Sequence, residues 1–363
     1  MIVASKRHIH ALFSNIMASL HPYSSVLFVS DNANWVLDWE IKEVSTIAQE
    51  SGVPCRISGS IPCGLPLQSL FLSSKYWLSR PGRYLYGKSR IAFPYFHGDP
   101  ASGEEVAVAC YNNLKRVHGK IDRIQVSNRR MRDIVLDSGV SPAKVFLIPI
   151  GVNPIYFKRQ TQESRKTYRF KYGIPQESVV IGSFQKDGNG WGEGATPKLI
   201  KGPDIFLKTI EILKNSVPEL FVLLSGPARG YVKQGLDRLK VPFTHIYLEH
   251  YPAINELYQC LDAYIVASRE EGGPKAILES MACGVPVIST QVGQAVDLIY
   301  HGKNGWLANL EDAEGLAHWT MKALASDEEK TALLEDGLMT ARENAYQAQR
   351  PLWEGFFKGF VRV

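Results

Sequence analysis

The chain has 363 residues, 45% of them hydrophobic and 21% charged, a composition that excludes a largely disordered chain, a collagen and a coiled coil. At about 100–200 residues per domain, this length predicts two domains, each able to bury its own core. The formal net charge of +5 is divided into +8 over residues 1–160 and −3 over residues 161–363, which indicates an anionic partner near the first half but is too small an excess to predict nucleic-acid binding.

Short apolar runs alternate with longer helical stretches along the first half of the chain. The run Val26–Val29 predicts a buried strand, which is followed by a polar loop and by a helix that ends before Gly52. Further strands are expected at residues 91–95, 123–126 and 145–148.

The second half repeats this alternation after a polar stretch at residues 157–169. Strands are expected at residues 179–184, 220–224, 245–248, 263–266 and 286–289, and helices at 204–214 and near 274–283. Because strands that alternate with helices are typical of parallel sheets, the chain is predicted to be an α/β protein with two doubly wound, Rossmann-like domains.

The predicted domains are residues 1–152 and residues 153–340. The last stretch, at about residues 341–363, carries aromatic side chains at helical spacing, namely Trp353, Phe356, Phe357 and Phe360. We expect this C-terminal helix to pack back on the N-terminal domain.

Five cysteines are scattered along the chain without the spacing of a metal site. Reduced thiols are typical of the cytoplasm, which is the predicted location. The chain has no run of 18 or more apolar residues and no Asp-x-Asp motif, so the sequence predicts neither a membrane-spanning helix nor a bound metal.

The most informative segment is residues 268–290, which follows a predicted strand and opens a predicted helix. Gly273 is expected to cap this helix and Pro274 to occupy its first position. A helix N-terminus with adjacent glycines is suited to bind an anion. The candidate ligand-binding residues of this segment are Gly272, Gly273, Pro274, Lys275 and Glu279.

Glu271 and Glu279 lie before and inside this predicted helix, too far apart for an adjacent acid and base pair. They are placed to bracket an extended ligand with phosphates at the helix end, and a nucleotide sugar has that shape. The alternative interpretation is that Glu271 is a solvated loop acid and Glu279 an exposed helix residue.

The pair Glu271-x7-Glu279, followed by Ser-Met-Ala-x-Gly-Val-Pro-Val-Ile-Ser-Thr, resembles the donor-binding signature of retaining GT-B glycosyltransferases of the large family 4. Three further elements agree in order: Val126-Ser127 with Ile148–Asn153, Lys201-Gly202-x-Asp204, and Asp297–Gly305. The resemblance covers about residues 124–335 well and residues 1–123 only in general layout. It implies a GT-B fold, in which two Rossmann-like domains face a central cleft. Residues 1–152 would then be the acceptor-side domain, and residues 153–340 would bind the nucleotide-sugar donor.

The resemblance also implies roles for individual residues. Glu271 would bind the hydroxyls of the donor sugar, Glu279 the ribose, and Lys201 the diphosphate. The family has an Arg beside that Lys, but a glycine-rich insertion, Asp187–Gly194, displaces this position here, and Lys186 is the stand-in, with Lys198 as the alternative. No cofactor is implied, because a UDP- or GDP-sugar serves as co-substrate.

The glycine-rich insertion is interpreted as a loop that closes over the donor, with a surface loop as the alternative. Alternating glycines also occur in dinucleotide fingerprints, but no acidic residue and following helix support that reading here.

The first half supplies weaker candidates. Asp31, Asn32 and Asn34 follow the first strand and are placed to meet donor phosphates or the acceptor, or else to cap the next helix. His97 ends another strand, and in the resembling family a His at a matching strand end lies near the reacting sugar. A structural histidine is the alternative.

Residues 75–90 interleave five cations with four aromatic side chains. This pattern suits an anionic membrane surface or a lipid-diphosphate acceptor, or else a solvated basic face.

The sequence therefore predicts a metal-independent, retaining glycosyltransferase that moves a sugar from a nucleotide-sugar donor to a glycan or lipid-linked acceptor in cell-surface polysaccharide or glycolipid synthesis. It would work in the cytoplasm, with a peripheral membrane association, and bind no nucleic acid. A GT-B-fold sugar-nucleotide epimerase, a non-catalytic sugar-nucleotide-binding protein and an unrelated Rossmann oxidoreductase remain alternatives.

Overall fold

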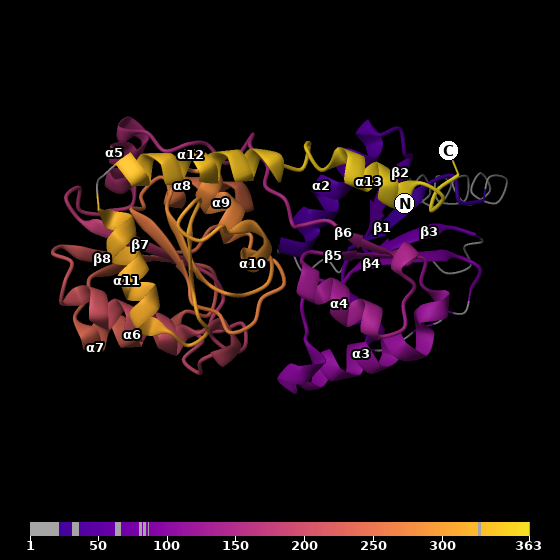
Figure 1. The fold of residues 1–363 in the computed structure, drawn as a ribbon, viewed down its shortest axis with the longest axis horizontal. Helices are drawn as coiled ribbons and strands as arrows, with labels where there is room; N and C mark the ends of the chain where they lie inside the picture. Colours follow the sequence, from indigo (N-terminus) through magenta and orange to yellow (C-terminus); the bar gives the residue numbers. More distant parts are fainter. Residues whose placement is uncertain are drawn as a thin grey trace, which may run out of the picture. The chain divides into compact units, whose positions relative to one another are not determined.

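The computed structural model describes residues 22–30, 36–61, 67–79, 82, 85, 87–325 and 328–362. Tertiary contacts divide the chain into two compact units (Figure 1). Unit 1 comprises Met1–Pro149 and Tyr346–Val363, and unit 2 comprises Ile150–Ala345. The corresponding boundaries expected from the sequence lie after residue 152 and near residue 341.

Unit 1 contains a six-stranded parallel sheet with the order β2-β1-β3-β4-β5-β6. Its strands are β1 (Val26–Val29), β2 (Cys55–Ser58), β3 (Ser69–Leu72), β4 (Arg90–Pro94), β5 (Arg123–Val126) and β6 (Val145–Leu147). The strand order reverses between β1 and β3, which makes the carboxyl ends of these strands the switch point of the sheet.

Helices cover both faces of this sheet, because successive strand residues point to opposite sides. Val26 and Phe28 pack with α2 (Val36–Glu50) and α13 (Arg350–Phe357), whereas Leu27 and Val29 belong to the core formed with α3 (Glu105–Val117) and α4 (Arg129–Asp137). In Figure 1, α13 lies beside α2.

The C-terminal segment is an integral part of unit 1. Trp353, Phe356, Phe357 and Phe360 are all at most 2% exposed. Trp353 and Phe356 contact the ring of Phe71 on β3. Burial of aromatic side chains is a large source of stability, so the last residues contribute directly to folding of this unit.

Unit 2 also contains six parallel strands, in the order β12-β11-β10-β7-β8-β9. They are β7 (Val179–Phe184), β8 (Leu220–Ser225), β9 (Phe243–Ile246), β10 (Ala263–Val266), β11 (Val287–Thr290) and β12 (Trp306–Ala308). This is the Rossmann order, with its switch point between β7 and β10.

The helices of unit 2 are α5 (Gln162–Lys171), α6 (Pro203–Lys214), α7 (Gly230–Leu239), α8 (Ile254–Tyr258), α9 (Ala276–Ala282), α10 (Ala295–Leu298), α11 (Ala313–Leu324) and α12 (Glu328–Glu343). One core is formed by the sheet with α6, α7 and α11, and the other by the sheet with α8 and α9. Within the described part of the chain, none of the helices is both long and apolar enough to cross a membrane.

Candidate functional site at the switch point of unit 2

The loops that follow β7 and β10 meet at the switch point of the unit 2 sheet. Gln185 and Lys186 come directly after β7, and Ser268 follows β10 by two residues. Ligands of open parallel sheets bind outside the carboxyl ends of the strands at such a point. This edge is therefore the part of unit 2 best suited to a ligand.

Lys201 and Glu271 form an ion pair at this edge. The Lys201 Nζ lies 2.6 Å from Glu271 Oε2, with side-chain exposures of 23% and 14%. Ser268 Oγ donates to the other carboxylate oxygen at 2.9 Å, and Gln185 Nε2 donates to the Lys201 carbonyl at 2.9 Å. Two residues that the sequence proposed separately for diphosphate and sugar are thus brought together, and both remain partly accessible.

Gly202 fixes the position of Lys201. It has a left-handed backbone with φ 63° between a short 3-10 helix, Leu199–Lys201, and α6. A Cβ at this position would lie 1.8 Å from the carbonyl oxygen of Ala267 at the end of β10. Glycine is required here because the chain passes so close to the strand that precedes Glu271.

Gly202→Ala is expected to lower the free energy of unfolding by about 2–5 kcal/mol, because a left-handed backbone costs about 1–2 kcal/mol and an overpacked contact about 1–3 kcal/mol. Gly52→Ala is the matched control, since Gly52 has φ 74° but no atom within 4 Å of its Cβ position. Its expected loss is the backbone cost of about 1–2 kcal/mol only. Urea unfolding at equilibrium measures both, and equal losses would contradict a steric role for Ala267.

Arg269 connects the loop after β10 with the start of α6. Its guanidinium donates to both carboxylate oxygens of Asp204, at 2.8 and 2.7 Å, and to Glu311 at 2.8 Å. The hydrogen bonds from Arg269 hold the pKa of Asp204 below its ordinary value. A bidentate pair of this kind is geometrically specific, so it fixes the start of α6 against the loop after β10.

The helix expected at Pro274 begins two residues later. The structure has α9 at Ala276–Ala282 with Lys275 as its N-cap, so the prediction that Gly273 caps a helix opened by Pro274 is wrong. The reason is tertiary packing of the preceding loop. Gln294 N donates to the Gly272 carbonyl at 3.1 Å, and a Cβ on Gly273 would lie 2.6 Å from Ile150 Cδ1. These contacts hold Gly272 and Gly273 outside the helix.

Glu279 is buried inside α9, only 3% exposed. Its carboxylate accepts hydrogen bonds from the hydroxyls of Tyr251 and Tyr258, the latter at 2.9 Å. The Lys275 Nζ lies 5.3 Å from the centre of the Tyr251 ring. The alternative interpretation of Glu279 as an exposed helix residue is therefore wrong.

Backbone hydrogen bonds hold the two ends of the glycine-rich insertion together. Gly188 pairs with Pro197 in an isolated antiparallel bridge, and Lys198 N donates to the Asp187 carbonyl at 2.8 Å. At its outer part the Lys186 Nζ lies 3.6 Å from the centre of the Trp191 ring. Lys186, which was proposed to replace the Arg of the resembling family, is thus held in a cation–π contact.

A buried ion pair anchors the same insertion to the strand end. Arg229 Nε lies 3.0 Å from Asp187 Oδ1, and their side chains are 0% and 1% exposed. Arg229 also donates to the carbonyls of Ser183 and Ser225, at 2.6 and 2.7 Å. Burial raises the pKa of Asp187 even though the charge of Arg229 acts in the opposite direction, and burial lowers the pKa of Arg229.

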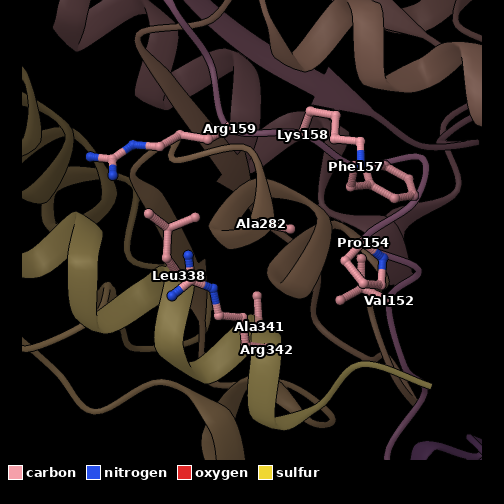
Figure 2. Close-up of a pocket in the computed structure, with 9 residues that line it drawn as sticks. All are labelled: Val152, Pro154, Phe157, Lys158, Arg159, Ala282, Leu338, Ala341 and Arg342. Carbon is pink, nitrogen blue, oxygen red and sulfur yellow. The ribbon is translucent and has the colours of Figure 1, made fainter. Parts of the chain in front are cut away.

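Two cavities of unit 2 lie away from the Lys201–Glu271 pair. One, of about 310 Å³, is lined by residues that include Trp191, Arg229, His245 and Tyr247. The other, of about 170 Å³, lies between residues 152–159 and α12, and Figure 2 shows Phe157 on one side and Leu338 with Ala341 on the other. The sequence-predicted donor residues line neither cavity.

Unit 1 contains the remaining candidates. His97 lies in the loop after β4, partly buried, and its Nε2 is 3.3 Å from the Tyr76 hydroxyl. Asp31, Asn32 and Asn34 lie outside the described residues. Lys75, placed by the sequence in a basic surface segment, is buried at 3% exposure, so it cannot serve as a surface cation.

Sequence reasoning missed several residues around the candidate site, namely Gln185, Ser268, Arg269, Tyr251 and Tyr258. Gln185 and Ser268 could have been proposed from the sequence, because both closely follow a predicted strand. The tyrosines could not, since their proximity to Glu279 depends on how α8 and the 3-10 helix before it, Tyr251–Ala253, pack against α9.

Comparison with known proteins also indicates a glycosyltransferase. The family described as "Glycosyl transferases group 1" matches residues 194–326. N-acetyl-alpha-D-glucosaminyl L-malate synthase of Bacillus anthracis is 26% identical over 199 residues, covering 54% of this chain and 47% of that protein. D-inositol 3-phosphate glycosyltransferase of Thermobispora bispora is 24% identical over 300 residues, covering 73% and 64%. The chain is therefore similar to the group 1 glycosyltransferases, and residues 194–326 carry the family match.

Solved structures agree with this family. HepE of Anabaena, in complex with UDP and glucose, superposes with a TM-score of 0.73 at 14% identity, covering 93% of this chain and 100% of that chain. Sucrose-phosphate synthase of Thermosynechococcus elongatus gives 0.73 at 15% identity, with 93% and 98% covered. The predicted fold class is confirmed, because the two parallel six-stranded sheets match GT-B glycosyltransferase structures.

The residues that match the family lie within unit 2. The matched residues 194–326 include Lys201, Glu271 and Glu279, whereas Lys186 and His97 precede them. The aligned part of the chain spans about half the length of the first curated relatives that it matches.

Proposed function

We propose that this chain is a group 1 glycosyltransferase that transfers a sugar from a nucleotide-sugar donor to a hydroxyl acceptor. The observation that carries the proposal is the Lys201–Glu271 pair, accessible at the β7/β10 switch point and inside the matched family region. A cation and a carboxylate at one edge suit the two parts of such a donor, an anionic diphosphate and a polyhydroxylated sugar.

Lys201 supplies positive charge to the diphosphate as it leaves. Two unit charges about 4 Å apart at an effective dielectric of about 20 interact by about 4 kcal/mol before desolvation. Charge that is held in place before the reaction stabilises the leaving group without reorganisation. Lys186 is the second cation in this proposal, and donor binding would draw its amine from the Trp191 ring.

Glu271 accepts hydrogen bonds from the sugar hydroxyls, while Ser268 holds its second oxygen. Glu279, oriented by two tyrosine hydroxyls, accepts from the ribose. Lys275, Pro274 and the backbone of Gly272 and Gly273 complete the donor surface. Because α9 has seven residues and begins at Ala276, this proposal assigns the diphosphate to lysine side chains rather than to the helix end.

The donor is proposed to be a UDP-sugar. HepE of Anabaena was crystallised with UDP-glucose, which supports this choice over a GDP-sugar. By the family resemblance, transfer retains the anomeric configuration through a front-face displacement, in which the departing phosphate helps to deprotonate the acceptor hydroxyl. His97 is the residue of unit 1 proposed to act near the reacting sugar.

The acceptor is proposed to be a glycan or a lipid-linked saccharide of cell-surface polysaccharide or glycolipid synthesis, used in the cytoplasm at an anionic membrane surface. The +8 charge of residues 1–160 supports an anionic partner. In the basic segment 75–90, Lys75 is buried and Arg90 donates to the Phe360 carbonyl at 2.9 Å, so exposed Lys88 is the better candidate for such contact.

Thermal-shift measurements with UDP-glucose, UDP-N-acetylglucosamine and GDP-mannose test the donor. A UDP-sugar at 100 times its Kd is expected to stabilise the fold by about 2.7 kcal/mol, and GDP-mannose to have no comparable effect. Release of UDP is then measured with and without saccharide acceptors, with EDTA present to test the expected independence of metal. A donor isomer formed without acceptor would establish the epimerase instead, and binding without any turnover would establish a sugar-nucleotide-binding protein.

A further inference from the structure

The loop that carries His97 is held by side chains at three consecutive carbonyls. The Phe96 carbonyl accepts from Ser127 Oγ at 3.3 Å, the His97 carbonyl from Lys75 Nζ, and the Gly98 carbonyl from the Tyr95 hydroxyl at 3.4 Å. Loop carbonyls are ordinarily satisfied by backbone or water, so three side-chain donors in succession indicate a loop whose path is specified.

Lys75 is the unusual donor of the three. Its side chain is 3% exposed, and its Nζ lies 4.9 Å from the centre of the Tyr95 ring. A Cβ on Gly98 would lie 1.6 Å from that Nζ, so the glycine leaves the space that the amine occupies. Burying an ammonium group costs free energy unless it is hydrogen-bonded or paired. The amine is therefore a built part of the His97 loop.

Tyr76, the next residue, holds the imidazole itself. Its hydroxyl lies 3.3 Å from His97 Nε2, and the two rings meet edge to face with centroids 5.7 Å apart. A hydroxyl that donates to Nε2 leaves the ring proton of the neutral imidazole on Nδ1. The same contact also limits rotation of the ring.

Both residues belong to one short 3-10 helix, Lys75–Leu78, which begins three residues after the end of β3. Ser74 caps this helix by accepting from Tyr76 N at 3.3 Å. The helix lies at the switch point of the unit 1 sheet. Because Lys75 and Tyr76 contact the loop after the neighbouring strand, β4, the position of the helix also determines the position of that loop.

We propose that Lys75 and Tyr76 are positioning residues for His97, Lys75 through the main chain of the loop and Tyr76 through the tautomer and orientation of the imidazole. This proposal rests on the proposed function only for the consequence in turnover. The juxtaposition itself predicts a property of His97 that is measurable in the enzyme without substrate.

The tautomer is tested by long-range ¹H–¹⁵N NMR of the histidine side chains in the full chain, with His97→Gln used to assign the His97 signals. In the parent protein the Nδ1–H form is expected to dominate at neutral pH. In Tyr76→Phe, which removes one partly exposed hydroxyl, the tautomer ratio of His97 is expected to shift toward the Nε2–H form that free histidine favours. Unchanged His97 signals in Tyr76→Phe would overturn the role of Tyr76.

Turnover gives the second readout. Tyr76→Phe is expected to lower kcat about two- to tenfold, the range of one neutral hydrogen bond, with donor KM unchanged. Lys75→Met is expected to lower kcat about ten- to hundredfold, because a charge-assisted hydrogen bond is lost. Lys115→Met is the matched control, since its amine lies 4.5 Å from the Tyr111 ring centre on the exposed side of α3.

A double-mutant cycle separates positioning from general destabilisation. If Tyr76 acts through His97, adding Tyr76→Phe to His97→Ala has no further effect on kcat. An undiminished loss in that background would overturn the proposal, even if Lys75→Met failed to fold. Absence of transfer by the parent chain with every nucleotide sugar would refute the proposed function, and the NMR result would still decide whether the two residues position His97.

Discussion

Lys201→Ala is expected to lower kcat about 10²- to 10³-fold, the loss typical when one preorganised stabilising group is removed from a developing charge. The lysine amine reaches the edge where the diphosphate would leave, and its loss also releases Glu271 from a 2.6 Å ion pair. Stability should change little, because the lysine side chain remains partly exposed and partly exposed ion pairs contribute about 1 kcal/mol or less. Turnover is measured as UDP release, and stability by urea unfolding.

Lys171→Ala is the matched control for this experiment. Lys171 forms an ion pair with Glu256 at 2.5 Å on the surface of the same unit, far more exposed and remote in sequence from the donor residues. Its loss should leave kcat within twofold of the parent. If Lys201→Ala behaved in the same way, the lysine would be removed from the mechanism, and the assignment of the diphosphate would have to be revised.

Arg229→Met is expected to destabilise the chain by about 3–5 kcal/mol, the cost of leaving a buried charge without its partner. Asp187 would remain fully buried at the end of β7, and the carbonyls of Ser183 and Ser225 would lose their donor. Equilibrium urea unfolding measures the loss.

Two further variants interpret that result. Asp187→Leu combined with Arg229→Met is expected to recover part of the lost stability, because neither charge is then buried. Arg132→Met, whose ion pair with Asp133 is about half exposed, should change stability by about 0.5 kcal/mol or less. Equal stability of Arg229→Met and the parent would contradict the anchoring of the insertion.

The local pattern of apolar residues was sufficient to predict many strands of the fold. Buried strands such as Val179–Phe184 and Ala263–Val266 read as continuous apolar runs, and the structure has both with these bounds. Strands β2, β3 and β12 were not predicted. β2 carries the exposed Arg56 and Ile57, so apolar content does not mark it. β3 and β12 are apolar but have only four and three residues, and short apolar runs do not by themselves distinguish a strand from other buried segments.

The candidate site could be predicted only in part from the sequence. Lys201, Glu271 and Glu279 could be proposed because motif spacing is a property of the chain itself. Their partners could not, since Arg269 meets Asp204 across 65 positions of sequence and Tyr258 meets Glu279 across 21. The start of α9 was misplaced for the same reason, because contacts with Gln294 and Ile150 hold the two glycines out of the helix.

The amino-acid sequence by itself determined the α/β class, the two doubly wound halves, the family resemblance and the main donor candidates, because periodicity and motif spacing are local. Tertiary structure decided which charges are surface charges. Lys75 was predicted in a basic surface segment, yet its amine is buried against the His97 loop. Asp187 was predicted in a glycine-rich loop, yet it forms a buried ion pair with Arg229. Burial depends on what distant segments bring to a residue, and no local pattern contains that information.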